Sequence, residues 1–252
     1  MIDTYKNACS ILMIATILCC VFSVGPAGAF ETDTFHTDSG DISITFLGHG
    51  SLMLAFDGLI VHIDPWGKVA DYSALPDADI LLLTHHHQDH LDPEALKEIV
   101  TDDTATICTE RCAKAVKHGE ITVASYGDII EVEELHIETV PAYNLDNLKN
   151  PGGHLVHPKG IGNGYIVSFG GLRLYFASET EFVPELKVIE DIDVLFIAVD
   201  AVYNMTPSMA AEFVKALQPK IFYPIHYADA DMNKLAQLLD DSGTELRLRE
   251  MK

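Results

Sequence analysis

Four histidines and one aspartate gather in the run Thr84–His90 (THHHQDH), directly after the apolar segment DILLL, which is typical of a buried strand. In extended backbone His85 and His87 point to the same side, and Asp89 and His90 follow closely enough to reach a second point nearby. One ion could bind the two imidazoles, and a second ion could bind the carboxylate and the remaining imidazole. Cations such as zinc accept such mixed sets of nitrogen and oxygen ligands. The alternative interpretation is a solvated, histidine-rich turn or a loose metal-binding tract.

The strands and helices that would position this run follow from hydrophobic periodicity and turn signals. In a first half we expect helices at 92–100 and 110–117 and strands at 42–47, 51–56, 59–63, 79–83, 105–108, 121–124, 129–132 and 135–140. After a polar loop, a second half is predicted to hold helices at 184–190, 206–217 and 231–239 and strands at 165–169, 172–176, 194–199 and 221–224. Two halves, each a sheet with outer helices, permit an α/β (α+β) fold built as a four-layer αββα sandwich.

The composition fits one sizeable globular domain, because 48% of the 252 residues are hydrophobic and 21% are charged. The formal net charge is −22. Since nucleic-acid backbones bind basic surfaces, this charge argues against a nucleic-acid partner. It also disfavours stable binding to anionic membranes. We therefore expect a solubilising acidic surface and a small-molecule substrate.

The first 29 residues differ from the rest of the chain. An apolar stretch, Ile11–Val24, precedes the small residues Ala27-Gly28-Ala29, which is the layout of a secretory signal peptide cleaved after Ala29. The stretch is short for a membrane span. We predict residues 1–29 as a signal peptide, residues 30–252 as one domain, and export to the periplasm or the medium. An uncleaved N-terminal membrane anchor is the alternative.

Two cysteines, Cys108 and Cys112, remain after removal of the predicted signal peptide. In an oxidising compartment an even pair favours a disulfide. Cys108 is expected at the end of a strand and Cys112 in the first turn of a helix, and convergence of their Cβ atoms cannot be read from a sequence. Two buried free thiols are at least as good an expectation.

The His-x-His-x-Asp-His run at 85–90, with Asp64 before it and His226 after it, resembles the signature of the metallo-β-lactamase superfamily. The closest resemblance is to the branch with L-ascorbate-6-phosphate lactonase-like proteins and other metal-dependent hydrolases, over nearly all of residues 30–252. The other matching pieces are FLGHGS (46–51), IDPW (63–66), VPAYN (140–144), HPKG (157–160), GY (164–165), YFASETE (175–181), YNMT (203–206) and PIHY (224–227). The resemblance implies the αββα sandwich and two divalent cations. Zinc is the expected metal, with manganese or iron as alternatives.

The resemblance also implies which side chains hold the cations. These come from the histidine run and from the ends of later strands: His85, His87, Asp89, His90, His157, Glu179 and His226. Asp89 would in addition orient the attacking nucleophile, which makes it the predicted catalytic residue. Asp64 would orient the histidine loop from behind the ligands. His49, in a Gly-His-Gly turn, either lines the cleft or is a structural loop histidine.

Two positions depart from the family pattern. Asn144 stands where many relatives carry the third histidine of the first metal site, so we choose His157 for that role and keep His154 as the alternative. Glu179 stands where the family has an aspartate that bridges both metals. Its side chain is one methylene longer, so the bridge could be shifted or only one metal held tightly. Ser178 replaces a glycine, which raises the question of whether the turn needs a positive φ.

The function that the resemblance implies is metal-dependent hydrolysis of a lactone or another ester by a metal-bound hydroxide. Phosphodiester hydrolysis by the same fold is the alternative among enzymes. A non-catalytic metal-binding protein, with Glu179 marking a decayed site, is the alternative from a different class. Fold alone does not name a substrate.

We expect the mature protein to lack residues 1–29, because the apolar stretch ends in an Ala-Gly-Ala cleavage site. N-terminal sequencing of the protein purified from its native cells should begin at Phe30. Recovery of intact Met1 in a membrane fraction would replace this prediction with the anchor.

Overall fold

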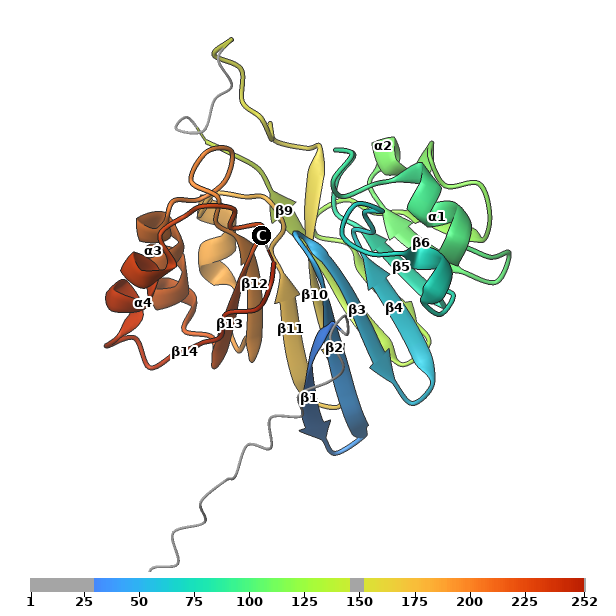
Figure 1. Ribbon diagram of the computed structural model, residues 1–252, viewed down its shortest axis with the longest axis horizontal. Helices are drawn as coiled ribbons and strands as arrows, with labels where there is room; N and C mark the ends of the chain where they lie inside the picture. The colour runs from blue at the N-terminus through green and yellow to red at the C-terminus, as the bar shows by residue number, and fades with distance from the viewer. Residues whose placement is uncertain (1–29, 146–151, 252) are drawn as a thin grey trace, which may run out of the picture.

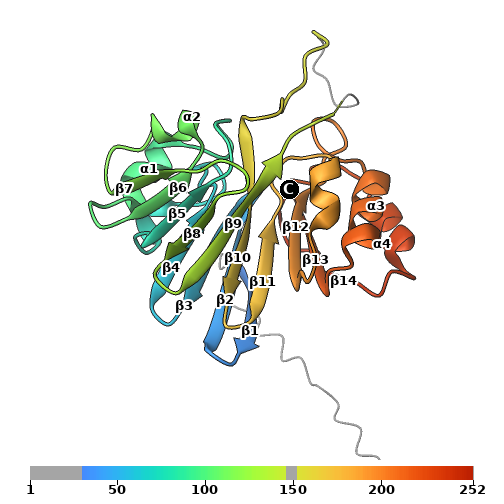
Figure 2. The same cartoon turned by 180° about the vertical axis from the view of Figure 1, so that it is seen from behind.

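The computed structural model describes residues 30–145 and 152–251, and in them the chain forms two seven-stranded sheets packed face to face. Figure 1 shows α1 (Pro93–Ile99) and α2 (Glu110–Ala113) outside one sheet and α3 (Pro207–Leu217) and α4 (Met232–Leu239) outside the other. Figure 2 shows the same layers from behind, so the predicted αββα sandwich is confirmed. Among these residues no helix has the length and hydropathy to cross a bilayer. The predicted signal peptide lies outside the described residues.

The first sheet takes its strands in chain order. They are β1 (Glu31–Thr37), β2 (Gly40–Gly48), β3 (Ser51–Phe56), β4 (Leu59–Ile63), β5 (Ile80–Leu83), β6 (Ala105–Cys108) and β7 (Glu120–Val123). The pairs from β1 to β4 are antiparallel, and those from β4 to β7 are parallel. Because parallel neighbours need a crossover, the short helix η1 (Tyr72–Ala74), α1 and α2 lie between the last four strands.

The second sheet repeats this plan. Its strands are β8 (Ile129–Val132), β9 (Leu135–Ala142), β10 (Gly162–Phe169), β11 (Leu172–Phe176), β12 (Val194–Ala198), β13 (Ile221–Ile225) and β14 (Glu245–Leu246). The first three pairs are antiparallel and the last three parallel, with η2 (Pro184–Val188), α3 and α4 as the crossovers. In both sheets the carboxyl ends of the parallel strands therefore share one edge.

Aromatic side chains fill the space between the two sheets. Phe46 on β2 lies 4.9 Å from Tyr223 on β13, measured between ring centroids, and Phe56 on β3 lies 4.4 Å from Phe169 on β10. The hydroxyl of Tyr165 on β10 donates to the carbonyl oxygen of Leu83 on β5 at 2.9 Å. Such buried aromatic area is a large apolar contribution to stability, and it fixes one sheet against the other.

The assignment of the strands at 129–132 and 135–140 to the first half is wrong. β8 pairs with β9, and β9 pairs with β10, so these strands open the second sheet. A hydrophobic pattern predicts that a segment is a strand, but it does not identify the neighbouring strand. β1 was not predicted because its side chains alternate between exposed and half-buried, and only its pairing with β2 defines it.

The helix predicted at 110–117 is shorter than expected and ends at Ala113. Gly119 then turns the chain into β7 with a φ of +79°, and a Cβ at this position would lie 2.1 Å from the carbonyl oxygen of Thr104. The tight return to the sheet therefore leaves room for only one helical turn.

Cys108 and Cys112 are buried free thiols, so the disulfide alternative does not describe this structure. Burial raises the pKa of Cys108 to about 12 and that of Cys112 to about 11. Because the thiolate is the reactive form, both side chains act as small core residues.

A charged cluster around Asp33 on β1 joins the first sheet to the second. The carboxylate accepts hydrogen bonds from the hydroxyl of Tyr223 on β13 and from Nη2 of Arg249, the latter at 2.6 and 2.7 Å. Nη1 of Arg247 lies 3.4 Å away. Burial alone would raise the pKa of Asp33, but the bonds from Arg249 and Tyr223 outweigh it and lower the pKa below the ordinary 3.8.

We expect Asp33→Asn to lower the free energy of unfolding at pH 7 by about 1–3 kcal/mol, because it removes the charge that Arg249 faces. A depressed pKa contributes stability above about pH 4 that is lost as the pH falls through the folded-state pKa. The difference between the variant and the wild type should therefore shrink at pH 3. Urea unfolding at both pH values measures it, with the exposed Asp38→Asn as the control. An equal difference at both pH values would contradict the role of the charge.

Candidate metal centre

Three overlapping groups of metal-ligating side chains form where the loops of the two sheets meet, and the third of them, Asp64, His85 and His90, links the two clusters that follow. The first cluster consists of His85, His87, His157 and Glu179. The second cluster consists of His49, Asp89, His90 and His226. Within each cluster the ligand atoms lie within 4.8 Å of one another. Segments far apart in the sequence thus converge on one small volume at the edge of the sandwich.

The carboxylate of Glu179 lies between the two clusters. Its Oε2 atom is 2.9 Å from Nε2 of His85 and 2.5 Å from Nε2 of His157. Its Oε1 atom is 3.2 Å from Nε2 of His226. The side chain is only 4% exposed. Oε2 also lies 3.8 Å from Nε2 of His90, so one buried carboxylate is close to imidazoles of both clusters.

The second cluster is closed by a contact between loops of the two sheets. The backbone N–H of His226, after β13, donates to the carbonyl oxygen of His49, after β2, at 2.9 Å. The two imidazole rings lie 3.5 Å apart between centroids. Oδ2 of Asp89 is 3.2 Å from Nε2 of His49 and 3.5 Å from Nε2 of His226. The ring of Trp66 also packs against His49, with ring centroids 4.7 Å apart.

Asp64, at the end of β4, holds the histidine loop in place. Its Oδ1 atom accepts from the backbone N–H of Thr84 at 2.8 Å, and its Oδ2 atom accepts from the Thr84 hydroxyl at 2.5 Å. The same Oδ2 atom lies 2.8 Å from Nδ1 of His90. Asp64 therefore contacts both the backbone of the histidine loop and one of its rings.

Hydrogen-bond partners fix which ring nitrogen carries the proton in two of the histidines. Nδ1 of His90 faces the carboxylate of Asp64 at 2.8 Å, and Nδ1 of His157 faces the amide oxygen of Asn144 at 3.1 Å. Both partners only accept hydrogen bonds, so each Nδ1 donates. In the neutral rings Nε2 then carries a lone pair directed into the centre.

The hydroxyl of Thr84 fixes which ring nitrogen of His85 carries the proton. The Thr84 hydroxyl gives its proton to Asp64, so it accepts from Nδ1 of His85, 3.1 Å away. Burial lowers the pKa of His85 to about 3, so the ring is neutral at pH 7. Its Nε2 lone pair points at Glu179.

Lone pairs and a carboxylate that converge in a buried place repel one another unless a positive charge lies among them. Nε2 of His90 is buried and has no hydrogen-bond partner among the described residues. Burial would lower the pKa of His90, but the charges of Glu179 and Asp64 raise it well above 6.5. The place thus attracts a proton or a cation, and a set of imidazole nitrogens and carboxylate oxygens fits zinc and similar divalent ions.

Four non-glycine residues around the centre have a positive φ, which is uncommon for residues with a side chain. They are His49 (55°), Asp64 (46°), Ser178 (61°) and His226 (47°). Each lies within two residues of a strand end and turns a side chain sharply into the junction. The question raised by Ser178 is thereby answered, since the turn does need a positive φ. Such strain persists at sites where surrounding contacts over-determine it.

All seven side chains predicted to bind metal lie in these two clusters. His157, not the exposed His154, reaches the first cluster. Asn144 supports His157, because its Oδ1 atom accepts from the backbone N–H of His157 and from the Nδ1 atom of the His157 ring. Glu179 occupies the central position expected for the replaced aspartate.

Sequence reasoning left the role of His49 open and missed Asp200 and Asn204. The structure places His49 in the second cluster. The Gly-His-Gly turn was the available signal for it, because Gly50 leaves no room for a Cβ, which would lie 2.7 Å from Cε1 of His90. Asn204 donates to Glu179, and Asp200 lies beside His226. Asn204 lies in the matching piece YNMT, to which no role was given, and Asp200 lies in none of the matching pieces.

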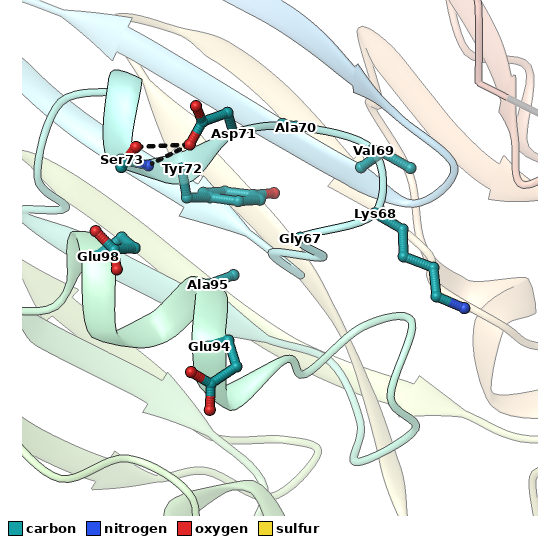
Figure 3. A pocket seen from close by; sticks show the side chains of 10 residues that line it. All are labelled: Gly67, Lys68, Val69, Ala70, Asp71, Tyr72, Ser73, Glu94, Ala95 and Glu98. Atoms are coloured by element: carbon teal, nitrogen blue, oxygen red, sulfur yellow. Dashed lines mark hydrogen bonds between the residues drawn. The ribbon is translucent and has the colours of Figure 1, made fainter.

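A hollow of about 560 Å³ lies nearby, between the loop after β4 and helix α1. Figure 3 shows the ring of Tyr72 directed into it and the side chain of Lys68 extending away from it. Asp71, on its rim, is engaged in capping η1 through Ser73. None of the residues that line this hollow belongs to either cluster, so the chemistry is assigned to the clusters.

Comparison with known proteins places this arrangement in a family. The model of the β-lactamase superfamily domain matches residues 43–226. The UPF0173 metal-dependent hydrolase MK1542 of Methanopyrus kandleri is 30% identical over 73% of this chain and 83% of its own length. The corresponding protein TTHA1283 of Thermus thermophilus is 30% identical over 74% of this chain and 84% of its own length.

Solved structures agree with this placement. A protein of Parabacteroides distasonis, provisionally described as a metal-dependent hydrolase, superposes with a TM-score of 0.82 at 43% identity, covering 88% of this chain and all of that one. The metallo hydrolase Igni18 of Ignicoccus hospitalis shares the fold, with a TM-score of 0.66 at 22% identity over 83% of this chain and 95% of that one.

The chain belongs to the metallo-β-lactamase superfamily, and its enzyme class is that of a metal-dependent hydrolase. The superfamily predicted from the histidine run is thus confirmed. The narrower resemblance to L-ascorbate-6-phosphate lactonase-like proteins stays a prediction.

We expect Asp64→Asn to lower the free energy of unfolding by roughly 2–3 kcal/mol, because one amide oxygen cannot replace the carboxylate that serves Thr84 and His90. Asparagine tolerates a positive φ, so the backbone turn should survive. Urea unfolding of chelator-treated protein measures the change. The control is Asp71→Asn, an exposed cap, which should cost no more than about 1 kcal/mol. An equal cost for both substitutions would contradict the central role of Asp64.

Proposed function

We propose that this protein is an exported hydrolase that holds two divalent cations, with zinc as the preferred metal. Its proposed reaction is the cleavage of a lactone or another ester of a small molecule. The observation that carries the proposal is the position of Glu179, whose buried carboxylate lies close to imidazole nitrogens of both clusters. Support for the ester class comes from the motifs that resemble the lactonase-like branch, and support for export from residues 1–29.

The chain's own residues divide into two ligand sets. His85, His87 and His157 would hold one cation, and Asp89, His90 and His226 the other, with Glu179 shared between them. Bound divalent cations would lower the pKa of a water molecule from ~16 to ~7 and so supply a nucleophile at neutral pH. The imidazole protons on Nδ1 of His90 and His157 are held by Asp64 and Asn144, which orient these rings.

Asp89 is the acidic group of the centre that is open to solvent. Its side chain is 34% exposed, whereas that of Glu179 is 4% exposed. Burial would raise the pKa of Asp89, but hydrogen bonds from His226 and His49 lower it strongly. Asp89 is therefore ionised at neutral pH and can accept a hydrogen bond from the attacking nucleophile. His49 fixes the direction of this carboxylate through its Nε2 atom.

The proposal is tested with purified residues 30–252, loaded with Zn²⁺ and dialysed. Two ions per chain and turnover of lactones or carboxylic esters are expected. Turnover of phosphodiesters alone would favour the alternative enzyme class. Tight metal binding without turnover of any of these would favour a non-catalytic metal-binding protein.

Glu179→Gln should reduce the metal content by about one ion per chain, because the amide nitrogen cannot ligate a cation. It should also lower kcat/KM by at least roughly 100-fold. Elemental analysis and initial rates measure both effects. The exposed Glu190→Gln is the matched control and should leave both unchanged. Two ions per chain and full activity in Glu179→Gln would show that the carboxylate is not shared between cations.

A further inference from the structure

The far end of Glu179 is held by a side chain outside both clusters. Nδ2 of Asn204 donates to Oε1 of Glu179 at 2.7 Å. Asn204 is fully buried, in the loop between β12 and α3. A hydrogen bond to a charged acceptor is about twice as strong as one between neutral groups. This bond acts on the oxygen that faces His226 and the second cluster.

Asp200 determines how the amide of Asn204 is oriented. Nδ2 of Asn204 also donates to Oδ2 of Asp200 at 3.2 Å, so its two protons serve two carboxylates. Turned over, the amide would place its oxygen against both of these carboxylates. The contact between Asn204 and Glu179 is therefore specified by charge and does not depend on shape alone.

The loop that presents Asn204 is closed by the same aspartate. Oδ1 of Asp200 accepts from the backbone N–H groups of Val202, Tyr203 and Asn204 at 2.8–2.9 Å. Oδ2 of Asp200 lies 3.7 Å from Nδ1 of His226, the ring nitrogen opposite the one that faces Glu179. One buried carboxylate thus contacts both the asparagine and a histidine of the second cluster.

The length of the Glu179 side chain explains why such a hold is needed. Glutamate has one more rotatable bond than aspartate, and fixing it costs additional conformational entropy. Left free, its two oxygens could rotate together toward the first cluster, where Nε2 atoms of His85 and His157 lie within 2.9 Å of Oε2. The bond from Asn204 keeps Oε1 directed at His226.

We propose that Asn204, oriented by Asp200, is a positioning residue that keeps Glu179 shared between the two clusters and so maintains affinity for the second cation. The inference rests on the proposed function for its metal, whereas the hydrogen bond from Asn204 to Glu179 is a feature of the structure itself. It assigns a role to two residues that are not ligands.

The experiment is a double-mutant cycle between Glu179→Asp and Asn204→Leu. In the wild-type background, Asn204→Leu should weaken binding of the second Zn²⁺ by roughly 10- to 100-fold, as expected for a lost bond to a charged group. In the Glu179→Asp background the shorter carboxylate no longer reaches Asn204, and the effect should fall below about threefold. Chelator competition measures the affinities. Co²⁺ absorption reports the geometry of the second site, and its spectrum should change in Asn204→Leu.

Thr206→Ala is the control for the loop. It removes the cap of α3, where Oγ1 accepts from the backbone N–H of Met209, without touching Glu179. It should lower Tm and leave Zn²⁺ affinity and the Co²⁺ spectrum unchanged. Asn204→Ser, which cannot reach Glu179, replaces Asn204→Leu if the latter fails to fold. Equal loss in both backgrounds, or no loss in the wild-type background, would overturn the proposal.

The same cycle, measured by urea unfolding of metal-free proteins, separates the two proposals. A coupling of at least about fivefold in the unfolding equilibrium constant is expected if Asn204 holds Glu179. If the wild type takes up no cation but this coupling is found, the proposed function fails and the contact stands. If cations bind and the coupling is absent, the positioning role fails alone.

Discussion

Buried negative charge at the junction of the two sheets is the constraint on which the rest of the structure depends. Asp64 and Glu179 are 2% and 4% exposed, and imidazole lone pairs face the latter. Removing such charges from water costs several kcal/mol per ion unless other charges or hydrogen bonds compensate. A proton on His90 or bound cations supply that compensation. Divalent cations bound only by the folded chain would therefore stabilise the fold.

The repeated plan of the two sheets explains how one edge collects so many polar groups. In each sheet the antiparallel strands come first and the parallel strands follow. Asp64 follows β4 and Glu179 follows β11, the strands at which the two sheets change from antiparallel to parallel pairing. The histidine loop follows β5, and Asp200 follows β12. Corresponding strand ends thus contribute the carboxylates of both sheets and the histidine loop to a single place, and His157 joins them from the connection between β9 and β10.

A residue of the centre can be predicted from the sequence when the pattern that marks it lies in one short stretch of the chain. The histidine run is compact and follows an apolar strand, and His226 and Glu179 also follow such strands, so the sequence pattern alone singles them out as candidates. The choice of His157 over His154 came from the order of motifs, because a polar loop has no period to read. Asn204 was missed because its partner is 25 residues away and because only the turn closed by Asp200 directs it inward. The pairing of β8 and β9 was missed for the same reason, since it is decided by tertiary contacts.

Glu179, which replaces the usual aspartate, has a longer and more flexible side chain, and the surrounding residues restrict its conformation. The carboxylate on this longer side chain lies close to Nε2 of His157 and Nε2 of His226 at the same time. The extra methylene also adds a rotatable bond, and free rotation about it would weaken the contacts with both histidines. Ser178 at φ 61° fixes the base of the side chain, and Asn204 fixes its end. A longer ligand fixed at both ends has the geometric precision of a shorter one. The position of Glu179 is therefore fixed by its neighbours at both ends.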